Sequence, residues 1–230
     1  AGGGTWADAA SQYNVAIGNY AMDAALNGAN YNIGIGYGAL GAITTSDTNV
    51  GIGYLALNEL TTNIDNVAVG FVAGRRITGE RNVAIGSYAL DYGYVVDDSV
   101  AIGYQSAQYA TGSNNTFVGF QSGRGGTTSA PYSSGTNNVA LGYEALKGFT
   151  TAQRMVAIGF EAMTDVTTGE DSVAIGYQAG YYNSGSDNVS IGFNAGYYAS
   201  AGSNVYMGYR AGNTSRGGSN TAIGASAIRY

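Results

Sequence analysis

Paired carboxylates are the residues of this sequence whose type and spacing come closest to a catalytic site. Glu144 and Glu161 occupy the same position in two successive copies of a repeated motif. Two carboxylates about 5 Å apart are the arrangement of a retaining glycosidase. Other repeats place an amide at this position, at Gln105, Gln121, Gln178 and Asn194. Because the position is merely polar elsewhere, we interpret Glu144 and Glu161 as solvated surface residues.

Metal and phosphate chemistry have weaker candidates. Asp47, Asp97 and Asp98 could offer oxygen ligands to Ca²⁺, but the Gly- and Asp-rich repeat of calcium-binding β-rolls is missing. Residues 34–38 (Gly-Ile-Gly-Tyr-Gly) resemble part of a phosphate loop, yet no helix is expected after them to hold a phosphate. The sequence has no histidine and no cysteine, which excludes Ser-His-Asp triads and His or Cys metal ligands. We expect no enzymatic activity and no cofactor.

Amino-acid composition limits which partners the chain can bind and where in or outside the cell it is expected. A net charge of −6 with a single lysine, Lys147, argues against nucleic acid, which requires a basic surface. No apolar run approaches the roughly 20 residues of a membrane span. Twenty tyrosines against six phenylalanines suggest rings at interfaces or on half-wet surfaces. The start Ala-Gly-Gly-Gly, without methionine, is typical of a mature secreted chain or of a shortened one. We expect an extracellular or cell-surface location.

One repeated motif must position all of these residues. It reads Asn-Val-Ala-Ile-Gly-aromatic-x-Ala and recurs thirteen times, every 16 to 18 residues except for one step of 23. Its glycines are Gly18, Gly36, Gly53, Gly70, Gly86, Gly103, Gly119, Gly142, Gly159, Gly176, Gly192, Gly208 and Gly224. Such a short period of β-type residues predicts an all-β fold, a single parallel β-solenoid (β-roll) of about 13 coils. We expect residues 1–13 to form a partial cap, residues 14–230 the solenoid, and residues 123–136 an inserted loop.

The pattern within one repeat predicts the path of a coil. Alternate strand residues point to opposite faces. We therefore expect the large pair Val83 and Ile85 to fill the interior and the small Ala84 to point outward. Glycine forms the corner, and an apolar residue seven positions later predicts a second, shorter strand. That later position holds Ile43, Leu60, Ile77, Phe149 and Val166.

Asparagine recurs four residues before the corner glycine. Ten of the thirteen repeats carry it, as Asn14, Asn32, Asn49, Asn66, Asn82, Asn115, Asn138, Asn188, Asn204 and Asn220. Stacked amides of successive coils can hydrogen-bond to one another. We therefore predict a structural asparagine ladder rather than a ligand site.

Two irregular places are candidates for binding. Tyr181, Tyr182, Tyr197 and Tyr198 fall at equivalent positions of neighbouring coils and predict an aromatic patch. The patch could contact a second copy of the chain or stack on a sugar ring of a cell-surface glycan or matrix, and we favour the second copy. Further candidates for these contacts are Trp6 and Tyr230, near the two ends of the chain. The 123–136 loop is either a binding loop or a tolerated insertion.

The motif resembles the head repeats of YadA-type trimeric autotransporter adhesins, and similar phrases occur in phage tail-fibre-like proteins. The best matches are residues 14–18, 82–86, 138–142, 172–176 and 220–224. The resemblance implies a left-handed parallel β-roll, a homotrimer and binding to a host surface. The repeat here is longer than the family's, and the sequence shows neither coiled-coil heptads nor a membrane anchor.

The ends of the sequence favour one function among three. The motif runs almost to the C-terminus, and no charged helix or proline covers either end of the solenoid. Uncovered strand edges can pair with other chains. We therefore expect a secreted structural subunit that stacks head-to-tail into an extracellular filament. The alternative is a head or shaft fragment of a trimeric surface adhesin or phage tail fibre, and a third possibility is a carbohydrate-binding β-helix module.

Overall fold

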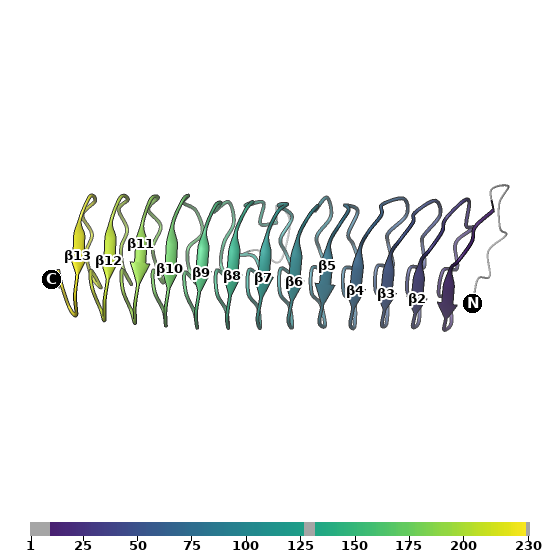
Figure 1. Cartoon of the computed structure of the whole chain (residues 1–230), viewed down its shortest axis with the longest axis horizontal. Helices are drawn as coiled ribbons and strands as arrows, with labels where there is room; N and C mark the ends of the chain where they lie inside the picture. The colour runs from purple at the N-terminus through teal and green to yellow at the C-terminus, as the bar shows by residue number, and fades with distance from the viewer. Residues whose placement is uncertain (1–9, 127–131, 229–230) are drawn as a thin grey trace. The chain divides into compact units, whose positions relative to one another are not determined.

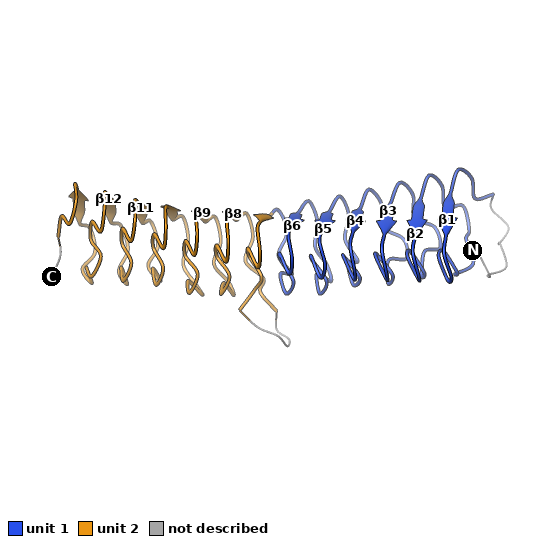
Figure 2. Ribbon diagram, turned by 90° about the horizontal axis from the view of Figure 1, so that it is seen from below, with its two compact units in different colours: residues 1–114 blue, residues 115–230 orange. Residues whose placement is uncertain are grey.

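The computed structural model describes residues 10–126 and 132–228 and is all-β (Figure 1). Its described residues form thirteen three-residue strands and no helix. The chain divides into two compact units, residues 1–114 and 115–230 (Figure 2). Unit 1 contains β1 (Val15–Ile17), β2 (Ile33–Ile35), β3 (Val50–Ile52), β4 (Val67–Val69), β5 (Val83–Ile85) and β6 (Val100–Ile102). Unit 2 contains β7 (Thr116–Val118), β8 (Val139–Leu141), β9 (Val156–Ile158), β10 (Val173–Ile175), β11 (Val189–Ile191), β12 (Val205–Met207) and β13 (Thr221–Ile223).

Within each unit, successive strands pair in parallel and in the same register. In unit 1, Val15 lies opposite Ile33 and Val67 opposite Val83, so equivalent motif positions always face one another. In unit 2, the longer connection after β7 leaves this register unchanged, with Thr116 opposite Val139. The thirteen parallel strands make a β-solenoid of about 12 turns with about 17 residues per turn. The predicted fold class is therefore confirmed, and its handedness stays a prediction.

The corner glycine is required by both conformation and space. Gly86 has a φ of +125°, a value that L side chains rarely adopt. A Cβ at this position would lie 2.6 Å from the carbonyl oxygen of Gly103 on the next coil. Gly176 repeats the arrangement in unit 2, where its Cβ would lie 2.7 Å from the oxygen of Gly192. The glycine column thus allows neighbouring coils to approach closely.

The prediction of which strand residues face inward was wrong. Ala84 is completely buried, whereas Ile85 is 38% exposed and Val83 is half-buried. The same pattern, with a buried middle residue, recurs in strands of both units. A coil of about 17 residues encloses too little space for two large side chains from its strand. The interior is filled instead by the small strand residue together with residues such as Ala89 and Leu90 from the turn side.

The predicted second strand is absent from the described residues, although apolar residues at its position are buried. Ile43 and Phe149 are both fully buried, but they lie in turn segments. Residues in the left-handed conformation, such as Leu55 and Leu57 with φ of 53° and 50°, reverse the chain after the corner. Because these residues interrupt an extended backbone, the return path of the coil is a series of turns.

Two coils place a large aromatic residue where the other strands have a small one. Phe117 in β7 and Tyr206 in β12 are fully buried. In both coils the position equivalent to Leu90 is a glycine, Gly123 or Gly212, where a Cβ would overlap the aromatic ring. Glycine leaves room for the ring in these coils, although Gly74, Gly180 and Gly196 occupy the same position beside small strand residues.

Candidate functional site

The asparagines form a buried column in each unit. In unit 1, the backbone N–H of Asn32 donates to Oδ1 of Asn14 at 2.9 Å, and that of Asn49 donates to Oδ1 of Asn32 at 2.9 Å. The side-chain Nδ2 of Asn32 also donates to Asn14 Oδ1 at 3.1 Å and to the carbonyl of Ser46, across the coil, at 2.7 Å. The amides therefore join each coil both to its neighbour and to its own far side.

The same column continues in unit 2 with two substitutions. The N–H of Asn138 donates to Oδ1 of Asn115 at 2.8 Å, and that of Asn204 to Oδ1 of Asn188 at 3.0 Å. Ser172 takes an asparagine's place, and its hydroxyl accepts from the N–H of Asn188 at 3.0 Å. Met155 accepts nothing equivalent. Because most of these asparagines are fully buried, their amides are closed to a ligand.

The two glutamates at equivalent positions already have partners. Glu144 lies 3.0 Å from Nζ of Lys147, and Oε2 of Glu161 accepts from Nε2 of Gln178 at 2.6 Å. An ion pair and a hydrogen bond of this kind stabilise surface carboxylates. The geometry supports no acid–base role for Glu144 and Glu161.

The candidate calcium ligands support turns. Oδ1 of Asp47 accepts from the N–H of Asn30 at 2.6 Å, and Oδ1 of Asp97 accepts from the N–H of Glu80 at 2.8 Å. Asp98 pairs with Arg81, with Nε to Oδ1 at 2.6 Å. Among the described residues, no cluster of three acidic, His or Cys side chains could hold a metal ion. Residues 34–38 lie in β2 and at the corner that follows it, not before a helix.

The predicted tyrosine patch is brought together in unit 2. Tyr181 stacks on Tyr197 with ring centroids 5.1 Å apart, and Tyr182 stacks on Tyr198 at 5.2 Å. Within each coil the two rings meet edge to face at 4.6 Å. Burial raises the pKa of Tyr181 to about 12, and the nearby carboxylate of Asp165 adds to this shift. The outer rings remain open, with Tyr182 41% and Tyr198 48% exposed.

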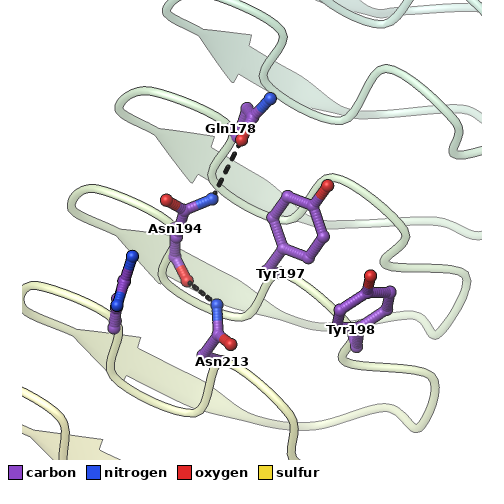
Figure 3. A pocket seen from close by; sticks show the side chains of 6 residues that line it. Gln178, Asn194, Tyr197, Tyr198 and Asn213 are labelled. Carbon is purple, nitrogen blue, oxygen red and sulfur yellow. Dashed lines mark hydrogen bonds between the residues drawn. The ribbon is translucent and has the colours of Figure 1, made fainter.

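A hollow of about 380 Å³ adjoins this patch (Figure 3). Its lining consists of Gln178, Asn194, Tyr197, Tyr198, Arg210 and Asn213. Nδ2 of Asn194 donates to Oε1 of Gln178 at 3.1 Å, and Nδ2 of Asn213 donates to the backbone oxygen of Asn194 at 3.2 Å. Sequence reasoning found the tyrosines but missed Arg210 and Asn213, because these become neighbours of the rings only once the coils are stacked.

Exposed and half-buried apolar residues lie on the outer face of the strands and directly after the corner glycine. In unit 2, this apolar strip comprises the outward strand residues Thr116, Val118, Val139, Leu141, Val156, Ile158, Val173, Ile175, Val189, Ile191, Val205 and Met207, and the rings Phe120, Tyr143, Phe160, Tyr177, Phe193 and Tyr209. The rings stack in an unbroken series with centroids 4.9 to 5.3 Å apart and are 39% to 50% exposed. Sequence reasoning missed this strip because it assigned the large strand residues to the interior.

Unit 1 contains a buried ion pair that sequence reasoning also missed. Asp91 is 2% exposed, and Nε of Arg75 lies 3.1 Å from its Oδ1. Loss of solvent raises the pKa of Asp91 to about 6, although the positive charges of Arg75 and Arg76 oppose this shift. Arg76 in turn lies over the ring of Tyr92, 4.4 Å from its centroid. Arg75 and Asp91 lie five residues after the corner glycine, the position that Tyr181 and Tyr197 occupy in two coils of unit 2.

Three predicted contacts lie wholly or partly outside the described residues. Trp6 and Tyr230 fall in the ranges 1–9 and 229–230, and the 123–136 loop is described except for 127–131. The two sides of the loop are joined where the N–H of Gly126 donates to Oγ of Ser133 at 2.9 Å. Ser133 is buried and donates to the carbonyl of Phe149 at 2.6 Å. The base of the loop is therefore part of the solenoid wall.

Across residues 10–126 and 132–228, no helix is long and apolar enough to cross a membrane. Comparisons with protein families, with curated proteins and with solved structures found no match to this chain.

Proposed function

We propose that the chain is a structural subunit of an extracellular or cell-surface fibre, in which copies of the chain associate side by side. The observation that carries this proposal is the apolar strip. Residues that point away from a small interior yet are Val, Ile, Leu and aromatic are typical of a face that another chain covers. The low content of charged residues and the resemblance to adhesin and tail-fibre repeats support the extracellular setting.

The area of the strip suits a stable interface. Six rings, each roughly 40% exposed and each of about 150–250 Å² in total, expose on the order of 500 Å² in unit 2. The Val, Ile, Leu and Met side chains beside them add to this area. A stable interface buries about 800 Å² on each partner. The strip of one unit is therefore comparable to a complete interface.

The periodicity of the strip indicates which partner fits it. Neighbouring rings Tyr143 and Phe160 are 4.9 Å apart, and Phe160 and Tyr177 are 5.2 Å apart. A surface that interdigitates with such a series must repeat at the same interval. A second copy of this chain meets that requirement directly. Charged residues are absent from the six motif positions between the asparagine and the ring in all thirteen repeats, so copies can approach without burying charge.

Sedimentation velocity across a concentration series tests this association. The matched variants are the double variant Ile158→Lys/Ile175→Lys on the strip and the single variant Ser184→Lys in an exposed turn of the same unit. We expect a discrete oligomer for the wild type and for Ser184→Lys, and a monomer with an unchanged circular dichroism spectrum for the double variant. The resemblance to trimeric adhesins favours three copies.

Two results would overturn the proposal. One is a wild-type chain that remains monomeric throughout the series. The other is a double-lysine variant that associates as the wild type does. Head-to-tail filaments remain a prediction of the sequence. Electron microscopy would support them by showing fibres one chain wide that also form with the Ile158→Lys/Ile175→Lys double variant.

A further inference from the structure

The hollow beside the tyrosine patch is the place where a stack of rings ends. Tyr181 and Tyr197 are stacked on successive coils, and the next coil has Asn213 at the equivalent position. Tyr198, beside Tyr197, also lines the hollow, and its backbone N–H donates to the carbonyl of Asn213 at 3.0 Å. The ring series therefore ends at Tyr197 among the described residues, and Tyr197 and Asn213 both line a space of about 380 Å³ (Figure 3).

The polar groups around this space are fixed and partly unused. Oε2 of Glu161 accepts from Nε2 of Gln178, and Oε1 of Gln178 accepts from Nδ2 of Asn194. This chain of bonds leaves Oδ1 of Asn194 without a hydrogen bond in the described part of the protein, although Asn194 is only 8% exposed. Oδ1 of Asn213 is likewise unused there, since only its Nδ2 is bonded. Both oxygens are open to solvent and can accept a hydrogen bond from a ligand or from water.

Charge in the lining comes from one residue. Arg210 follows Gln178 and Asn194 at the same position of successive coils. Its guanidinium lies 5.2 Å from the ring centroid of Tyr209 and forms no ion pair with any described residue. Among the equivalent residues of the preceding coils, the acidic one nearest to Arg210 is Glu161. Its carboxylate accepts a hydrogen bond from Gln178, which lies two coils before Arg210. A guanidinium that stacks on a ring keeps its N–H donors free for a carboxylate.

We propose that this hollow binds a carboxylate-bearing pyranose, with the sugar ring stacked on Tyr197 as the next member of the ring series. The C–H face of a pyranose is apolar and packs on an aromatic ring. Its hydroxyl groups donate to the amide oxygens of Asn194 and Asn213. Its carboxylate pairs with Arg210. A volume of about 380 Å³ lies within the range of small-ligand pockets.

This site goes beyond the proposed association and does not depend on it. The apolar strip follows the outer face of the strands, whereas the hollow lies over side chains that follow the corner glycine by two, five or six residues. All six lining residues belong to unit 2 of one chain. Binding can therefore be measured whether the chain is a monomer or an oligomer.

Ligand-detected saturation-transfer NMR and calorimetry on the full chain test the proposal. The probes are methyl β-D-glucuronide and its neutral counterpart methyl β-D-glucoside, each at up to about 10 mM, which detects dissociation constants near 1 mM. We expect the glucuronide to bind at least tenfold more tightly than the glucoside. Arg210→Gln should weaken the glucuronide at least tenfold and leave the glucoside within twofold. Arg216→Gln, which removes an exposed arginine six residues later, should change neither.

Asn213→Tyr is the second test and is expected to preserve the fold. The new ring would continue the series from Tyr181 and Tyr197 and fill the hollow. Binding of both sugars should then be lost, with an unchanged circular dichroism spectrum. Three results would overturn the proposal. They are no glucuronide binding by the wild type, equal weakening by Arg210→Gln and Arg216→Gln, and undiminished binding by Asn213→Tyr.

Discussion

The two units share one backbone pattern and differ in what they display on it. In unit 2, six rings of the apolar strip stack without interruption. In unit 1, Tyr54 and Phe71 stack at 5.0 Å, but the next coil has Ser87 at the ring position and a tyrosine one residue later. Phe71 therefore meets Tyr88 edge to face, with the ring planes 69° apart. A shift of one residue breaks the surface column while β5 keeps its register.

The position five residues after the corner glycine varies from coil to coil. Two successive coils of unit 1 hold the charged pair Arg75 and Asp91 there, and two successive coils of unit 2 hold Tyr181 and Tyr197, although Arg124 and Lys147 also occupy it in unit 2. Glycine and asparagine columns hold the backbone of both units, so outward positions are free to diverge. The comparison teaches that this solenoid separates its structural residues from those that meet partners. The following changes test that separation, from the largest expected effect to the smallest.

Replacing a corner glycine should damage both units equally. Gly86→Ala in unit 1 and Gly176→Ala in unit 2 force an unfavourable φ and a clash with the next coil. We expect each to lower the free energy of unfolding by on the order of 4 kcal/mol in urea titrations. The control is Gly224→Ala, where φ is +116° but no atom lies within 4 Å, so only the conformational cost remains. Tolerance of the change in one unit alone would contradict a shared backbone requirement.

Removing a ladder amide should cost more in unit 1 than removing its substitute in unit 2. Asn66→Ala leaves the N–H of Asn82 and the carbonyl of Gly79 without partners, both now within 3.0 Å of the side chain. The expected loss is about 3 kcal/mol, because two buried groups are left unsatisfied. Ser172→Ala removes the acceptor for Asn188 and should cost about 1–2 kcal/mol. Equal losses in chemical denaturation would show that the amide's second bond contributes nothing.

The buried charge pair of unit 1 should make stability depend on pH in the sense opposite to that of Asp171 in unit 2, whose pKa is lowered by Arg154. The folded-state pKa of Asp91, about 6, lies above its ordinary value of 3.8, so protonation favours the folded chain. Its contribution to stability is greatest below about pH 4 and is lost as the pH rises through 6. The free energy of unfolding of Asp91→Asn relative to wild type should rise by about 2 kcal/mol between these values. If the difference in free energy of unfolding between Asp91→Asn and wild type does not change with pH, the carboxyl group of Asp91 is solvated rather than buried.

Exchanging two residues should repair the ring column of unit 1. The double variant Ser87→Tyr/Tyr88→Ser places a ring between Phe71 and Tyr104 at the stacking position. We expect a gain of less than about 1 kcal/mol in thermal unfolding, because the new stacked pairs replace the edge-to-face pairs that Tyr88 makes with Phe71 and Tyr104. Tyr143→Ser in unit 2 removes two stacked pairs without replacement and should cost about 1 kcal/mol. If neither changes stability, the column serves association alone, and sedimentation should then show the difference.

The sequence predicted where the strands lie but not which way they face. The spacing of glycines such as Gly53 and Gly70 located each strand and its register, because every coil repeats the same positions. A strand of large, small and large residues can face the interior either with its two large residues or with its small one, and the sequence pattern is the same in both cases. The decisive quantity was the narrow interior, which accepts Ala84 and excludes Ile85. Only an estimate of the volume inside one coil could have indicated that the small residue faces inward.

The hollow was beyond sequence reasoning for a related reason. The tyrosine pairs were visible as repeats, and their stacking followed from the period. Arg210 and Asn213 carry no pattern of their own in the sequence. Their positions depend on left-handed residues in the turns, including Asn194 at φ 52° and Arg210 at φ 55°. Such conformations depend on the stacked coils rather than on local preference, because most residue types rarely adopt them.

Because all coils of a unit pair in the same way, each added or deleted coil changes the length of the unit by the same amount. Val156 pairs with Val139 on one side and Val173 on the other, and the same three-residue register recurs along each unit. If one whole coil were lost or duplicated, the coils on either side of the change would still pair with each other as all other coils do. It would alter the reach of a unit by about 4.8 Å, the spacing of paired strands. Length can therefore vary among such chains without redesign of the interior.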